Sequence, residues 1–188
     1  MKFGVFILLS AVLLGGCLSS APKAPAYWLI EPVATTVFEA ATPKFGSVRI
    51  APVSVRAPYD GTRLVVLRRD GSVAFDGFNS FASAPGAILT GVTEDIVSAS
   101  GLFERVVRPT SSAAAVHSLE VTVTRLALDC KVEGTRHAVA DVTVQLLKGR
   151  EIVSVSKGSG SRPAASGDYS SACSSAVTAA LANALKGL

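Results

Sequence analysis

The sequence predicts an α+β fold, a two-layer sandwich of a mostly antiparallel mixed β-sheet with a C-terminal β-meander and two main helices packed on one face. The meander is indicated by residues 116–157, where apolar and polar residues alternate in three stretches separated by turn signals. The helices are indicated by residues 85–100 and 169–185, where apolar residues recur three or four positions apart. The chain has 188 residues, enough for one domain with a sizeable core.

Short strands precede the first helix. Pro52 interrupts one of them, which suggests an edge strand or a bulge, and the run Arg69–Ser72 predicts a tight hairpin. Residues 76–83 read as a loop that carries Phe78 and Phe81, and these two side chains either cover the edge of the core or contact a partner. The expected strands in this region are 27–30, 47–55, 64–67 and 73–75.

The first helix is expected to begin at Pro85, because proline is favoured in a first turn, and to end at Gly101 in a left-handed cap. A short strand over 102–107 should follow it. A long strand then runs from Val116 to about residue 130. Its apolar positions change phase after Arg125, which predicts a β-bulge.

The meander continues with strands over 138–146 and 152–157, and the Gly- and Ser-rich residues 158–167 read as a loop. Asp168 or Ser170 can cap the last helix. Its alanines would let this helix lie close to a sheet. Its inward stripe consists of Tyr169, Cys173, Val177, Leu181 and Leu185.

The start of the chain has the pattern of an export signal. Lys2 precedes an apolar run over 5–14, shorter than the roughly 20 residues that a membrane-spanning helix needs. Residues 1–16 therefore read as a signal peptide cleaved before Cys17, with 17–26 as a tether and 27–188 as a single domain. The alternative is an ordinary signal peptide in which the cysteine is incidental.

The ending Leu14-Gly15-Gly16-Cys17 resembles the lipobox of bacterial lipoproteins. This resemblance implies that the sulfur of Cys17 receives a diacylglyceryl group and that the new amino end is acylated. Several acyl chains would give stable membrane anchoring. The next residue is Leu18 rather than the Asp that retains such lipoproteins at the inner membrane, so the resemblance points to the periplasmic face of the outer membrane.

Two further cysteines, Cys130 and Cys173, would lie in a compartment that permits disulfides. We expect a bridge between them, because one ends an inward row of the meander and the other lies on the inward stripe of the last helix. The chain-entropy model gives such a bridge at most about 4 kcal/mol of stabilisation. The alternative is a pair of buried free thiols.

The sequence shows no pattern typical of a reaction centre. The net charge is +4, basic residues are scattered and aromatic residues make up 6%, so nucleic-acid binding is excluded as a class. His117 and His137 stand alone without metal-ligand spacing, and there is neither a Gly-x-Ser-x-Gly elbow nor a Walker-type loop. We therefore expect no catalytic residues, no metal and no cofactor other than the lipid on Cys17, which favours a binding module.

The order of several short motifs resembles the ABC-type transport auxiliary lipoproteins across almost the whole mature chain. The motifs are the lipobox, Tyr27-Trp28-Leu29, the strand 48–53, the loop 57–62 around Tyr59, the strand 64–68, the segment 78–82 and Gly167-Asp168-Tyr169. This sequence departs from the family pattern at two places: Phe81 stands where the family has a Trp, and the Leu-Asp-Arg sequence of the loop 57–62 is degraded.

The resemblance implies a periplasmic lipoprotein that works with an MCE-domain protein and an ABC permease and ATPase to move lipid between membranes. Tyr59, Phe78 and Phe81 are the candidate docking residues. Family members can form rings, so a homo-oligomer is one expectation. Two other hypotheses stay open: a structural envelope lipoprotein that assists assembly of another outer-membrane complex, and a small periplasmic enzyme.

Overall fold

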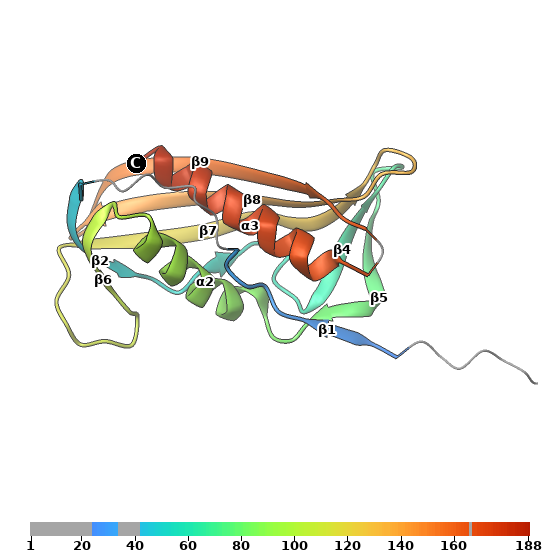
Figure 1. Cartoon of the computed structure of the whole chain (residues 1–188), viewed down its shortest axis with the longest axis horizontal. Helices are drawn as coiled ribbons and strands as arrows, with labels where there is room; N and C mark the ends of the chain where they lie inside the picture. Colours follow the sequence, from blue (N-terminus) through green and yellow to red (C-terminus); the bar gives the residue numbers. More distant parts are fainter. Residues whose placement is uncertain (1–23, 34–41, 166) are drawn as a thin grey trace, which may run out of the picture.

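The computed structural model describes residues 24–33, 42–165 and 167–188. The expected signal peptide, Cys17 and most of the expected tether lie outside these described residues. Within them, nine strands form one mixed sheet, and two helices, α2 (Pro85–Ala99) and α3 (Tyr169–Lys186), cover one of its faces (Figure 1). The predicted α+β class is confirmed. Neither of these helices has the length and apolar character needed to cross a bilayer.

The long strand β7 (His117–Cys130) organises the sheet. On one side it pairs in parallel with three short strands in succession, and on the other side it pairs antiparallel with β8 along its length. The three parallel partners are β2 (Phe45–Ile50), β3 (Ser54–Val55) and β4 (Arg63–Arg68). The meander is completed by β8 (His137–Lys148) and β9 (Glu151–Pro163), which also pair antiparallel.

Three strands form the margins of the sheet. At one margin β1 (Ala26–Trp28) runs parallel to β5 (Val73–Phe81), which in turn pairs with β4. At another, β6 (Phe103–Val107) pairs with β2. The third margin is β9, which pairs with β8 alone in the described part of the chain.

Several local predictions are confirmed. The chain leaves the sheet between β2 and β3, around Pro52, and the register of β7 against β8 shifts between Val123 and Arg125, as a bulge requires. Helix α2 has Pro85 in its first turn and is followed by Gly101 with φ +65°. Asp168 occupies the position before α3 but makes no capping hydrogen bond with its side chain.

Two predicted loops are wrong. The first is 76–83, because β5 continues through Phe81. Asp76 accepts hydrogen bonds from the backbone N–H groups of Phe78 and Asn79 at 2.8 and 3.0 Å. These bonds stabilise an irregular stretch of β5, after which residues 79–81 pair with β1. The second is the Gly- and Ser-rich run 158–167, because β9 extends to Pro163.

The glycines of β9 serve packing rather than a loop. A Cβ at Gly160 would stand 1.9 Å from the carbonyl oxygen of Ala176, and a Cβ at Gly158 would stand 2.0 Å from that of Ala180. Both contacts are far inside van der Waals distance. The strand therefore has no side chain at the two positions where the backbone of α3 lies against it.

The two faces of the sheet differ in what covers them. The main core lies between the sheet and the helices, and it includes the whole predicted stripe of α3. Strand alternation sends every second residue to the other face. There, Val65 and Leu67 of β4 form a second, smaller buried cluster with Ala127 and Val139, against which Tyr59 packs.

Candidate functional site

A row of hydroxyl groups on α3 holds the segment that follows β1. Ser170 donates a hydrogen bond to the carbonyl of Leu29 at 2.7 Å, and the hydroxyl of Ser174 accepts one from the N–H of Glu31 at 3.1 Å. Thr178 accepts from the N–H of Val33 at 3.2 Å. Because residues four apart lie on one face of a helix, these three hydroxyls meet alternate residues of an extended segment. The N-terminal segment is thus fixed along α3.

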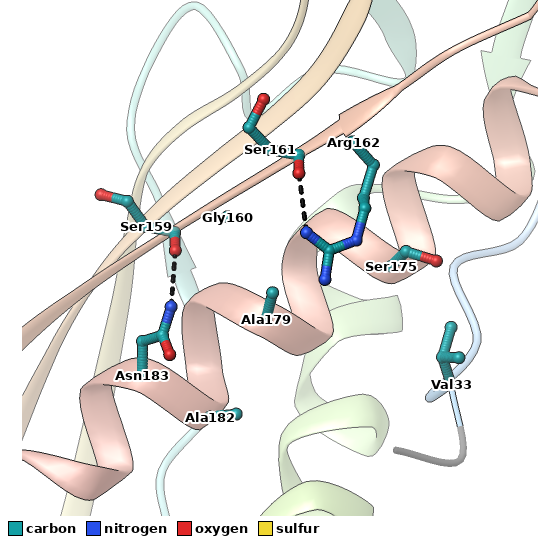
Figure 2. A pocket seen from close by; sticks show the side chains of 9 residues that line it. All are labelled: Val33, Ser159, Gly160, Ser161, Arg162, Ser175, Ala179, Ala182 and Asn183. Atoms are coloured by element: carbon teal, nitrogen blue, oxygen red, sulfur yellow. Dashed lines mark hydrogen bonds between the residues drawn. The ribbon is translucent and has the colours of Figure 1, made fainter. Parts of the chain in front are cut away.

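A groove lies between α3 and the outer margin of β9, and Figure 2 shows its lining. Its volume is about 270 Å³. The side chain of Asn183 donates a hydrogen bond of 3.0 Å to the carbonyl of Ser159, and that of Arg162 donates one of 2.9 Å to the carbonyl of Ser161. These two backbone carbonyls of β9 therefore have side-chain donors. The lining residues are Val33, Ser159, Gly160, Ser161, Arg162, Ser175, Ala179, Ala182 and Asn183. This set contains no carboxylate, imidazole or thiol.

The three predicted docking residues do not form one surface. Phe81 is 3% exposed and belongs to the main core, because β5 turns its side chain toward the helices. Tyr59 is half-buried and packs against both apolar clusters. Only Phe78 is well exposed, at 49%. The docking assignment of Phe81 is therefore corrected to a core role, which was the alternative interpretation of that residue.

The two cysteines are free thiols in this structure, so the expected bridge is absent from it. Cys173 is buried on the stripe of α3, and burial raises the pKa of its thiol to about 12. Cys130 is half-buried at the end of β7 and packs against the same core, and burial raises its pKa as well. Two protonated, shielded thiols are poor nucleophiles and poor metal ligands.

One hydroxyl–imidazole pair occurs on the face of the sheet away from the helices. Ser161 Oγ lies 3.4 Å from His137 Nδ1, and Asp129 lines the same surface hollow. The backbone N–H of Lys131 donates a hydrogen bond of 3.0 Å to Oδ1 of Asp129. In a nucleophile–base pair, a third group orients the base. Here the carboxylate of Asp129 contacts Lys131, and His137 is not among its hydrogen-bond partners. Sequence reasoning missed the pair because it depends on the register of β8 against β9.

Metal ligation finds no support in the part of the chain that the structure describes. No group of three or more His, Cys, Asp or Glu side chains there is placed to hold an ion. His117, the other histidine, packs its ring edge-on against Phe45 at 5.8 Å between centroids. Arg125 and Asp141 form a half-buried ion pair of 2.7 Å across β7 and β8, which is a structural contact of the sheet.

The fold and these surfaces define an α+β domain that offers grooves and faces to other molecules. Residues 27–188 match the family model described as ABC-type transport auxiliary lipoprotein component, and the chain belongs to this family. The match covers the whole domain predicted from the sequence. A search of curated protein sequences returns no match.

Solved structures share the fold. Protein XCC0632 from Xanthomonas campestris superposes with a TM-score of 0.66 at 18% identity, covering 87% of this chain and 91% of that one. A second crystal structure, of an uncharacterized protein, gives a TM-score of 0.55 at 13% identity over 81% and 90% of the two chains.

Proposed function

We propose that the mature protein is a lipid-anchored, non-catalytic auxiliary subunit of an ABC/MCE-type system that moves lipid between the inner and outer membranes. The observation that carries this proposal is the family match, which spans residues 27–188 and thus the entire folded domain. The partners would be an MCE-domain protein and the ABC permease and ATPase. The sequence has no Walker-type phosphate-binding loop, which agrees with a separate ATPase supplying the energy.

Anchoring is supported by the Leu-Gly-Gly-Cys ending at Cys17 and by the position of the first strand. The nine residues from Cys17 to Pro25 lead directly to β1. Even fully extended, they span at most about 30 Å. An acylated Cys17 would therefore hold the domain against the membrane. Leu18, in place of a retention signal, supports the periplasmic face of the outer membrane.

Within this role, the groove between α3 and β9 is our candidate for the contact with the MCE-domain partner. Its lining of small side chains leaves room beside the sheet margin, and Arg162 adds a cation there. Such a shape fits an extended peptide segment that places alternate side chains into the groove. Phe78 and Tyr59 lie elsewhere on the domain, and Phe81 lies in the core.

The test is recovery of partners from solubilised membranes. The acylated protein should retain MCE and permease subunits, and Ala179→Arg, which fills the groove, should reduce that recovery. Ser98→Arg, at an exposed position of α2, is the matched control and should have no effect. Recovery of a barrel or a secretin with no transporter subunit would contradict the proposal and favour a structural envelope lipoprotein.

A further inference from the structure

Every aromatic side chain that the structure describes as exposed lies on β1 or β5. Tyr27 is 69% exposed, Phe75 44% and Phe78 49%. The aliphatic residues Leu29 and Val73 beside them are also exposed. We name this set, Tyr27, Leu29, Val73, Phe75 and Phe78, the β1–β5 patch. A gathering of exposed large apolar side chains marks an interaction surface.

The strand pairing shows which way the patch faces. Trp28 packs against Tyr169 of α3, with 5.2 Å between ring centroids, so its neighbour Tyr27 points away from the helices. Tyr27 pairs with Ser80, and Ser80 pairs with Arg63. Arg63 in turn lies over the ring of Phe75, with its Cζ 4.5 Å from the centroid. Aromatic rings and a guanidinium thus share the face of the sheet that carries no helix.

The patch also lies where the anchor must be. In Figure 1, β1 lies beside β5 at one end of the elongated domain. Cys17 is ten residues before Tyr27, so a membrane that holds the acyl chains is within about 35 Å of Tyr27. The hydroxyl row of α3 holds the segment after β1, so the patch belongs to the folded body of the domain.

We infer that the β1–β5 patch rests on the phospholipid surface, with Tyr27 and Phe78 at the level of the headgroups. This inference relies on the proposed function, because it needs Cys17 to be acylated. A ring with one polar end, such as that of Tyr27, favours the membrane–water interface, and the apolar ring of Phe78 favours the boundary with the acyl chains. Arg63 would meet the phosphate groups of anionic lipids. The opposite end of the domain, where β2 and β6 lie, then points into the periplasm and is open to partners.

The experiment uses the acylated full chain in vesicles of phosphatidylethanolamine and phosphatidylglycerol with brominated acyl chains. The chain has one tryptophan, so Trp28→Phe gives a silent background. In it, Phe78→Trp should lose roughly half of its emission relative to vesicles without bromine, as expected for a ring seated at the headgroup–acyl boundary. The control is Val116→Trp, equally exposed at 52% but immediately before β7, and its emission should not change.

Flotation of the vesicles separates the two proposals. Protein that does not float has no anchor, which contradicts the proposed function and the inference together. Protein that floats without quenching of Phe78→Trp and of a second reporter, Tyr27→Trp, overturns the inference alone. The same holds if Val116→Trp is quenched equally, or if the emission of the reporters changes with added partner subunits or a second copy of the chain and not with bromine.

Discussion

The hydroxyl of Ser174 accepts a hydrogen bond of 3.1 Å from the backbone N–H of Glu31, and this bond joins two residues 143 positions apart. It is the middle contact of a row in which Ser170 and Thr178 bind Leu29 and Val33, two positions before and after Glu31. Ser174 is buried and Glu31 is exposed, so the bond is partly buried at the edge of α3. The segment that leads from the proposed anchor is therefore part of the folded domain.

We predict that Ser174→Ala lowers the free energy of unfolding by about 1–2 kcal/mol, because the N–H of Glu31 loses its acceptor. Urea denaturation measures this change, and hydrogen exchange at Glu31 should become faster than in the parent. Ser175→Ala, one residue along the same helix and lining the groove, is the matched control and should change little. Equal effects from both variants would contradict a specific role for the Ser174 contact.

The close approach of α3 to β9 predicts that a side chain at Gly160 lowers the stability of the protein. Gly160→Ala places a Cβ 1.9 Å from the carbonyl oxygen of Ala176, which is backbone and cannot move without shifting the helix. We expect a loss of about 3 kcal/mol or more, beyond the usual cost of overpacking. Thermal unfolding of Gly160→Ala beside Ser161→Ala, which alters the opposite face, measures the difference. A Gly160→Ala protein as stable as its parent would show that the strand and helix are not in contact there.

The corrected role of Phe81 is testable against Phe78. Phe81→Ala should destabilise the protein by about 3–5 kcal/mol, because it leaves a cavity in the main core. Phe78→Ala should stay within about 0.5 kcal/mol, because the side chain is on the surface. Chemical denaturation of both variants gives the comparison, and similar costs for the two would contradict the orientation of β5.

The thiol of Cys173 gives a pH-dependent contribution to stability. Its pKa is raised by burial from 9.0 to about 12, so its contribution is complete below pH 9.0. Above that, the unfolded chain loses the proton while the folded chain keeps it, and the free energy of unfolding falls as pH rises. The slope from this group is at most about 1.4 kcal/mol per pH unit.

Cys173→Ala supplies the comparison, because the other groups that titrate at high pH are common to both proteins. The stability difference between parent and variant should shrink as pH rises from about 8 to about 10. A difference that stays constant would show that the thiol is not shielded. In denatured, non-reduced protein, the thiols of both Cys130 and Cys173 should react with a thiol reagent. If neither thiol reacts, the two cysteines form the bridge that this structure lacks.

Patterns that depend on neighbouring residues predicted much of the fold. The stripe of α3, the helix from Pro85 to the cap at Gly101, the break around Pro52 and the bulge in β7 are each determined by local spacing, and each is confirmed. The prediction of a loop over residues 158–163 is wrong, because Gly and Ser usually indicate a loop and these residues belong to β9. Here the glycines leave room for a helix that the strand meets only in three dimensions.

The candidate sites were harder to predict, because they depend on strand pairing and long-range contacts. The hydroxyls of Ser170, Ser174 and Thr178 are four positions apart, and that spacing was a usable signal for a helix that binds a backbone. Nothing local indicates that Phe78 is exposed while Phe81 is buried, since an irregular strand decides it. The parallel pairing of β2, β3 and β4 with β7 is likewise a property of the whole sheet.

The most direct test of the account is metabolic labelling of the full chain with a fatty-acid probe, followed by membrane fractionation, for the parent and for Cys17→Ala. The account predicts a labelled parent in the outer-membrane fraction and an unlabelled variant that has lost the membrane. An unlabelled parent protein that diffuses freely would contradict it.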